Sequence, residues 1–161
     1  GDVYKRQNQL YSAELAEVLE KNLTLVYSGQ TRLSGINNWE VYKGFFDKNQ
    51  TVREGLKNIA LLSNQAFLAI KEKKFSSLPE FIAKEGEIRT TLFPGIVSPD
   101  MERLYNKIRA DVPNLGMKVC GAGGGGCFLL VHSEQDRSLV RERVVAHNSM
   151  SVLDLKVAQP L

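Results

Sequence analysis

The feature that most constrains this 161-residue chain is an unbroken run of small residues, Gly121-Ala122-Gly123-Gly124-Gly125-Gly126. Glycine loses more backbone freedom on folding than any other residue, so such a run is costly to order. The apolar segments 117–120 and 127–131 on either side predict two strands joined by this loop. A strand-to-strand turn normally needs only about two to five residues. The free N–H groups of a longer glycine loop can form an anion-binding nest, so we interpret the run as a phosphate-proximal loop, with a plain flexible turn as the alternative.

Two other glycine-loop motifs do not fit this sequence. A Walker loop needs Lys followed by Ser or Thr after its last glycine, whereas Gly126 is followed by Cys127-Phe128. A dinucleotide fingerprint needs a helix directly after the glycines, whereas 128–131 has the pattern of a strand. The dipole of a following helix is therefore not the main attraction for an anion at this loop.

The remaining pattern predicts an α+β fold. Helical spacing of apolar residues favours helices over 8–21, 51–73, 77–91 and 134–147, and another that begins at a Ser98 cap and ends by Pro113. Trp39, Tyr42, Phe45 and Phe46 fall on one helical face. Segments 23–27 and 150–156 have strand character. The order strand, helices, strand, strand, helix, strand is that of a ferredoxin-like split βαβ antiparallel sheet with helices packed on one face.

Composition excludes several classes of protein. Hydrophobic residues make up 43% and charged residues 24%, which is ordinary for a soluble globular domain. There is no apolar run near the ~18 residues of a membrane span and no signal peptide, so we expect a cytoplasmic protein without a membrane partner. The net charge is +3, and the Lys and Arg residues are spread along the chain, so the sequence has no cluster of basic residues typical of nucleic-acid binding. Residues 1–7 have no period and no initiator Met, and we interpret them as a non-native junction before a domain at 8–161.

The two cysteines, Cys120 and Cys127, border the glycine run. Only His132 and His147 remain to complete a zinc site, and the spacing is not that of one, so no metal is expected. We expect both cysteines to be small buried residues on adjacent strands, with a metal site or a disulfide as the lesser alternatives.

The segment from Lys118 to Phe128 resembles the third signature motif of the GHMP kinases, which include galactokinase, homoserine kinase, mevalonate kinase and phosphomevalonate kinase. Ser98-Pro99-Asp100 and the segment from Val26 to Arg32 are also similar to the branch of heptose-phosphate kinases and fucokinases. The similarity spans roughly residues 20–160.

This resemblance implies a ferredoxin-like C-terminal domain whose loop, Gly121 to Gly126, lines the active-site cleft near the phosphates of ATP. It implies that Ser28, Gly29, Arg32 and Lys118 are close to the substrate. Arg32 has the fork geometry to pair with an anionic group, although a surface salt bridge explains it as well. Lys118 is equally well explained as a solvated surface lysine.

The family's main nucleotide loop, of the type Pro-x-x-x-Gly-Leu-Gly-Ser-Ser, does not occur in this sequence. Because that loop and the family's catalytic residues belong to the N-terminal domain, we expect this chain to contain no catalytic residue. ATP and Mg2+ would be bound mainly by that absent domain, which is the expected partner of this one. Phosphoryl transfer depends on positioning and charge neutralisation, so we expect the chain to be inactive alone.

The function that follows is the C-terminal part of an ATP-dependent kinase for a sugar or sugar phosphate. D-glycero-D-manno-heptose 7-phosphate is the favoured substrate, with fucose or another hexose behind it. The alternative is a stand-alone ferredoxin-like domain that binds a phosphorylated metabolite through the glycine loop.

Overall fold

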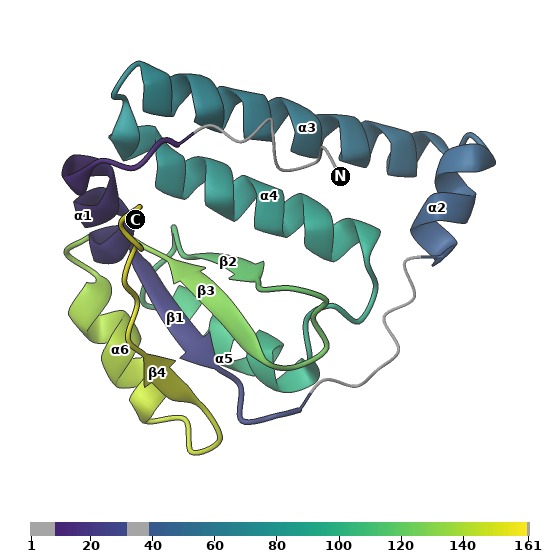
Figure 1. Ribbon diagram of the computed structural model, residues 1–161. Helices are drawn as coiled ribbons and strands as arrows, with labels where there is room; N and C mark the ends of the chain where they lie inside the picture. Colours follow the sequence, from purple (N-terminus) through teal and green to yellow (C-terminus); the bar gives the residue numbers. More distant parts are fainter. Residues whose placement is uncertain (1–8, 32–38, 161) are drawn as a thin grey trace.

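A computed structural model describes residues 9–31 and 39–160 (Figure 1). The predicted junction 1–7 and Arg32 lie outside these residues. The elements in chain order are α1 (Ala13–Asn22), β1 (Leu23–Tyr27), α2 (Trp39–Phe46), α3 (Gln50–Lys71), a short 3-10 helix (Phe75–Ser77), α4 (Leu78–Leu92), α5 (Pro99–Arg109), β2 (Gly116–Val119), β3 (Cys127–Val131), α6 (Arg137–Val145) and β4 (Ser151–Leu153).

The four strands form one antiparallel sheet in the order β2-β3-β1-β4. In chain order, β1-α5-β2-β3-α6-β4 is the split βαβ arrangement, and α2, α3 and α4 are inserted between β1 and α5. The predicted α+β, ferredoxin-like class is therefore confirmed.

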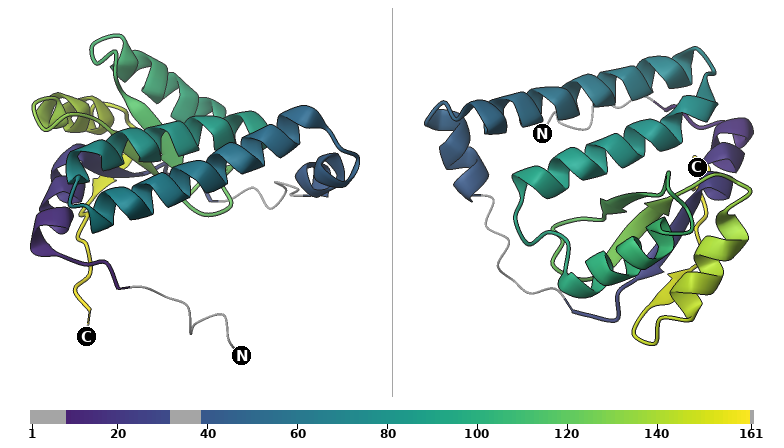
Figure 2. Two further views of the ribbon diagram at one scale, coloured as in Figure 1. Left: turned by 90° about the horizontal axis from the view of Figure 1, so that it is seen from above. Right: turned by 180° about the vertical axis from the view of Figure 1, so that it is seen from behind.

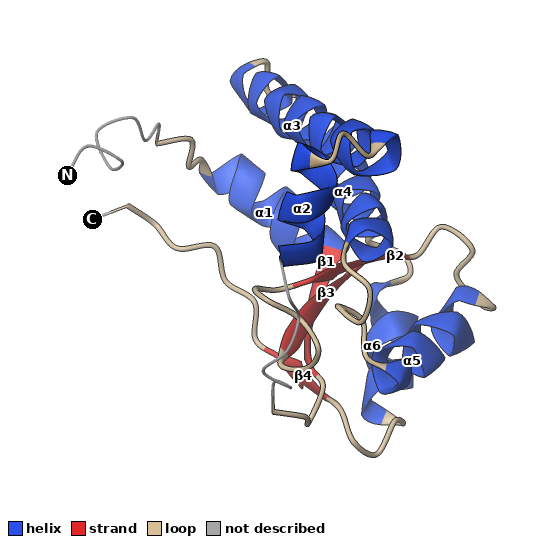
Figure 3. Cartoon of the chain, turned by 90° about the vertical axis from the view of Figure 1, so that its right-hand side faces the viewer, coloured by secondary structure: helices blue, strands red, loops and turns tan. Residues whose placement is uncertain are grey.

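The main core lies between one face of the sheet and helices α5 and α6, which Figure 3 shows on the same side of the strands. Alternation along the strands turns Val26, Val119, Phe128 and Leu130 toward this face. Helices α5 and α6 contribute the apolar residues that meet them, Met101, Leu104, Ile108, Val140 and Val144, all of which are fully buried or nearly so. This core fixes both strands that hold the glycine loop.

The inserted helices take the other side of the sheet. Gly116 and Lys118 alternate with the core residues of β2, and the helix that they meet is α4. A Cβ on Gly86 would lie 2.1 Å from the carbonyl O of Met117, so the helix backbone nearly touches the strand. Helix α3 runs alongside α4 on its outer side (Figures 1 and 2), and a second apolar cluster joins these helices to α1. Helix α4 thus covers β2 from the face opposite α5 and α6, so the expectation that the helices pack on one face of the sheet is wrong, because the small residues Gly86 and Gly116 let α4 approach the second face.

The predicted element boundaries differ from the observed ones at several places, and specific contacts accompany two of these differences. Helix α1 begins at Ala13 rather than near residue 8, because the Ser12 hydroxyl caps it by accepting the N–H of Leu15 at 3.1 Å. The last strand ends at Leu153 instead of continuing to 156. Beyond it, the Glu20 carboxylate accepts the N–H of Val157 at 2.9 Å and so draws the chain toward α1.

The Ser98 cap was predicted correctly, since its hydroxyl accepts the N–H of Met101 at 3.4 Å with Pro99 in the first turn. In the described ranges, we find no helix that combines the length and the apolar character of a membrane span.

Candidate functional site

The glycine loop joins β2 to β3, and its backbone explains its composition. Positive φ angles occur at Gly121 (69°), Gly123 (78°), Gly124 (70°), Gly125 (148°) and Gly126 (75°). Residues with a Cβ rarely adopt this region, so the path of the loop requires glycine at these positions. The cost of ordering the run is thus explained by the conformation that it takes.

Two other segments hold the loop in place. The N–H of Gly124 donates to the carbonyl of Ile96, just before α5, at 2.8 Å. The N–H of Gly126 donates to Gln30 O at 2.9 Å, and the N–H of Ser28 donates to Gly126 O at 2.9 Å. A Cβ on Gly123 would lie 2.3 Å from Ile96 Cγ1, so the loop also approaches this residue closely. The loop is therefore anchored between the end of β1 and the start of α5.

Four backbone donors of the anchored loop have no partner in the described part of the chain. Among the residues that the structure describes, the N–H groups of Gly121, Ala122, Gly123 and Gly125 have no hydrogen-bond acceptor. Consecutive free amides in a glycine-rich loop make a partial positive concavity that suits phosphate oxygens. The loop can therefore bind an anion without help from a helix dipole.

Ser28 and Gly29, which were predicted to be near the substrate, do lie against this loop. The Ser28 side chain is fully buried, and its hydroxyl accepts the N–H of Gln30 at 3.3 Å. Gly29 has φ 71°, and a Cβ there would lie 2.0 Å from the carbonyl O of Ser149. Both residues shape the turn that anchors the loop, and the Ser28 hydroxyl is directed into the protein.

Lys118 is directed toward α4. Its ammonium donates to Glu85, and the same carboxylate accepts from Arg89, which lies one turn further along α4. Burial raises the pKa of Glu85, but the hydrogen bonds from Arg89 and Lys118 outweigh this and hold its pKa below the ordinary value. Two cations share one carboxylate, so the cluster keeps an excess positive charge.

Arg89 also lines a cavity of about 740 Å³ beside the glycine loop. In Figure 1, helix α2, the end of α4 and the β2–β3 loop lie on the same side of the molecule. The aromatic rings of α2 are largely exposed there, with exposed fractions of 59% for Tyr42 and 75% for Phe46. The lining residues come from α2, α3, α4, the segment before α5 and the loop: Val41, Tyr42, Phe45, Phe46, Leu56, Arg89, Phe93, Ile96, Gly121 and Ala122. The cavity is apolar, with one cation and the free amides at its edge.

Sequence reasoning did not find this cavity. Trp39, Tyr42, Phe45 and Phe46 were predicted to share one helical face, but this spacing does not indicate a cavity. Arg89 carried no signal of its own, because its position depends on how α4 packs against β2.

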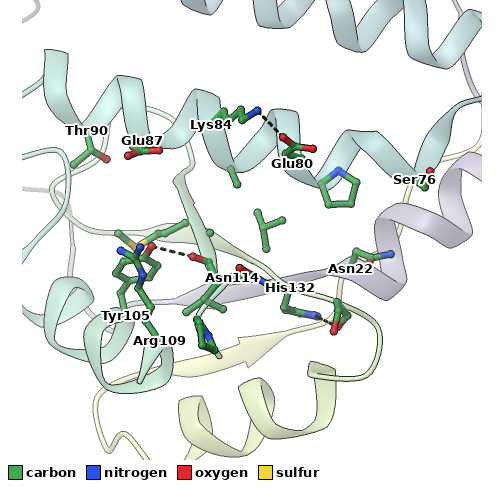
Figure 4. A pocket seen from close by; sticks show the side chains of 18 of the residues that line it. Asn22, Ser76, Glu80, Lys84, Glu87, Thr90, Tyr105, Arg109, Asn114 and His132 are labelled. Carbon is green, nitrogen blue, oxygen red and sulfur yellow. Dashed lines mark hydrogen bonds and ion pairs between the residues drawn. The ribbon is translucent and has the colours of Figure 1, made fainter. Parts of the chain in front are cut away.

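A larger hollow of about 850 Å³ lies elsewhere, between α4, α5 and the edge of β2 (Figure 4). Its lining includes Glu87, Tyr105 and Arg109 but no residue of the glycine loop. The Tyr105 hydroxyl donates to the carbonyl of Leu115 at 3.0 Å and so closes one wall. We therefore place the candidate site at the smaller cavity, where the free amides are.

Asp100, in the first turn of α5, links the start of this helix to the α6–β4 turn. Its carboxylate accepts from the Ser149 hydroxyl at 2.6 Å and lies 3.1 Å from His147 Nε2. The Ser149 hydrogen bond is the main cause that keeps the pKa of Asp100 below its ordinary value, against the opposite effect of burial. Since Ser149 bonds to the carboxylate and not to His147, these residues do not form a nucleophilic triad.

The fold and the loop together define a class: a ferredoxin-like domain with a long glycine-rich loop between two antiparallel strands. Within this class, the chain belongs to the GHMP kinase family, because the family model for "GHMP kinases C terminal" matches residues 66–149, which is just over half of the chain.

Individual relatives are distant. The bifunctional fucokinase/GDP-fucose pyrophosphorylase of Arabidopsis thaliana is 22% identical over 144 residues, covering 89% of this chain and 14% of that protein. The Methanococcus jannaschii mevalonate kinase structure matches with a TM-score of 0.62 and 21% identity, over 92% of this chain and 44% of that one. Streptococcus pneumoniae phosphomevalonate kinase matches with a TM-score of 0.59 and 17% identity, over 82% and 38%. The chain thus spans less than half the length of these relatives, and the two structures support the fold alone.

Proposed function

We propose that this chain is the C-terminal part of an ATP-dependent small-molecule kinase that phosphorylates a sugar or sugar phosphate. The observation that carries the proposal is the anchored glycine loop, in which four backbone N–H groups have no acceptor among the described residues. Membership of the GHMP kinase family and the similarity to a fucokinase support a phosphotransferase rather than a plain binding domain.

The role of the loop follows from the charge that moves in phosphoryl transfer. Fixed N–H groups that point at phosphate oxygens stabilise the charge that develops there, without reorganisation during the reaction. Gly121, Ala122, Gly123 and Gly125 would supply these donors to a bound phosphate group. ATP, when bound, supplies the transferred phosphoryl group.

Mg2+ does not fit the described part of this chain in the same way. No group of three or more His, Cys, Asp or Glu side chains there is arranged to hold a metal ion. We therefore assign the metal ligands, the main nucleotide loop and the catalytic residues to a further domain of the parent protein, the partner with which this chain would form the cleft.

The cavity beside the loop favours an anionic acceptor. Aromatic walls suit the C–H face of a sugar, and Arg89 brings positive charge that Glu85 only partly offsets, since Lys118 shares that carboxylate. A sugar phosphate satisfies both features better than a neutral sugar. D-glycero-D-manno-heptose 7-phosphate is our first choice because of the resemblance of 26–32 to heptose-phosphate kinases, and fucose or another hexose is the second.

The test is a coupled ADP-release assay on the parent protein, with heptose 7-phosphate, fucose, hexoses and mevalonate as acceptors. We expect turnover on a sugar or sugar phosphate with the parent protein and none with residues 8–161 alone. Turnover by the 161-residue chain alone, or a parent protein that accepts only mevalonate, would show the assignment to be wrong.

The second candidate function is binding through the glycine loop without catalysis. Because the free amides belong to this chain alone, the domain could bind a phosphorylated metabolite by itself. Saturable binding of a sugar phosphate that ATP neither enhances nor competes with, together with no turnover by the parent protein, favours this alternative.

A further inference from the structure

Cys120 and Cys127 stand opposite each other at the base of the glycine loop, a feature that the kinase proposal does not use. The register of β2 and β3 pairs Val119 with Phe128, so the next pair outward is Cys120 with Cys127. The N–H of Cys120 donates to the carbonyl of Cys127 at 3.0 Å, which continues the ladder by one pair. Directly opposed residues of this type have Cα atoms about 5.5 Å apart, within the range of about 4.4–6.8 Å that disulfides span.

Both thiols point to the same face of the sheet, the one opposite α5 and α6, and both are partly exposed. Val119 and Phe128 point into the core with α5 and α6, so their neighbours Cys120 and Cys127 point to the other face. That face is open next to them, since Tyr27, which pairs with Cys127, is 37% exposed. Each cysteine is free and only half-buried, which corrects the expectation that both are buried core residues.

From this geometry we propose that Cys120 and Cys127 are an oxidative modification site, at which a reversible disulfide closes the base of the glycine loop.

The reaction requires a hydroperoxide as the oxidant. The Cys127 thiolate attacks a peroxide oxygen, the O–O bond breaks, and Cys127 becomes a sulfenic acid while the leaving oxygen departs as water after taking up a proton. The Cys120 sulfur then attacks the Cys127 sulfur, the S–O bond breaks, and the thiol proton leaves with the hydroxide as a second water. Two thiols and one hydrogen peroxide give one disulfide and two waters, a two-electron oxidation.

The order of the two steps follows from the environment of Cys120. Burial raises the pKa of its thiol, and the nearby Cys127 adds to this, although Lys118 acts in the opposite direction. A raised pKa lowers the thiolate fraction of Cys120, which disfavours this thiol as the nucleophile toward peroxide.

A disulfide would draw the two ends of the loop together. Opposed residues on antiparallel strands have Cβ atoms about 4.5–5.5 Å apart, whereas a disulfide prefers about 3.5–4.5 Å. Oxidation would thus restrain the loop from Gly121 to Gly126, which contains the free amides.

The test is to treat the purified chain with hydrogen peroxide at neutral pH, block free thiols, digest with trypsin and measure masses. Both cysteines lie in one tryptic peptide, 119–137, which follows Lys118 and ends at Arg137. We expect this peptide to lose about 2 Da, to resist alkylation, and to recover fully after dithiothreitol. The Cys120→Ser variant should instead trap a sulfenic acid at Cys127, detected with dimedone, and neither Cys120→Ser nor Cys127→Ser should form the intramolecular disulfide.

The two cysteines are close in sequence, which by itself favours a disulfide between them. A comparison with the urea-unfolded chain shows how much the fold adds. In a glutathione buffer we expect the native chain to form the bond at least about tenfold more readily than the unfolded chain, because the fold raises the effective thiol concentration. Equal or weaker formation in the native chain, linked dimers, or only sulfinic products would overturn the proposal. Because the readout is the chain's own mass, the result is independent of whether the parent protein is a kinase.

Discussion

Replacing Gly86 with Ala tests the closest contact between a helix and the sheet. The added Cβ would lie 2.1 Å from Met117 O and 3.0 Å from Lys118 Cα, both of them backbone atoms of β2. Ordinary contacts begin near 3.4 Å, so α4 and β2 would have to separate by more than 1 Å, as a rough figure. Alanine in a helix interior gains about 1 kcal/mol over glycine. Overpacking of a filled contact costs about 1–3 kcal/mol, and a rigid backbone obstacle belongs at or beyond the upper end of that range.

The net expectation for Gly86→Ala is a loss of about 2 kcal/mol in the free energy of unfolding, measured by urea titration. For a chain of this length, that loss corresponds to a fall of about 4–8 °C in Tm. Gly55→Ala is the matched control, since Gly55 is also inside a helix but its Cβ would meet only the flexible end of Leu92, at 2.8 Å. We expect Gly55→Ala to remain within about 1 kcal/mol of the wild type. A Gly86→Ala chain as stable as Gly55→Ala would refute the reasoning that backbone contact fixes α4 on β2.

Three further predictions concern the loop, the ion cluster and a helix cap. Gly123→Ala places a Cβ 2.3 Å from Ile96 Cγ1 at a φ of 78°, so we expect a loss of about 1–3 kcal/mol in the free energy of unfolding. The variant should also bind inorganic phosphate more weakly in an NMR titration. Phosphate-induced shifts equal to those of the wild type would argue against the anion-binding nest. Since the pKa of Glu85 is lowered in the folded chain, the carboxylate stabilises the fold above its ordinary pKa of 4.5, and this effect is lost as the pH falls below that value. In urea unfolding, Glu85→Gln should therefore lose less stability on acidification than the wild type. Curves of stability against pH that run parallel for the two proteins would contradict this. Ser98→Ala removes the cap of α5 and should cost about 1 kcal/mol, whereas Ser77→Ala, at a start of α4 with no side-chain cap bond, should cost less; thermal unfolding of both variants decides between them.

The parts of the structure that sequence could predict depend on local pattern. The apolar segments beside the glycine run predicted β2 and β3, and the Ser98-Pro99 pair predicted the start of α5 to the residue. The glycine run also agrees with the positive φ angles of the loop, because only glycine adopts them without strain.

What could not be predicted depends on contacts between distant residues. Ala83 and Gly86 are unremarkable in a helical pattern, and only the structure shows that they allow α4 to meet Gly116 and Met117. The same packing places Arg89 at the cavity and turns Lys118 toward Glu85. The half-exposure of both cysteines likewise depends on an open sheet face, which no local pattern reports.

The position of α4 also decides how this sheet meets other chains. Hydrogen bonds to β3 use alternate residues of β2, so the polar groups of Met117 face outward, where a foreign strand would pair. Helix α4 lies against that carbonyl and blocks the approach. At the opposite side, β4 has only three residues, too short to be a good template for pairing. A variant that loosens α4 would therefore lose more than stability: it would uncover a strand edge and promote aggregation.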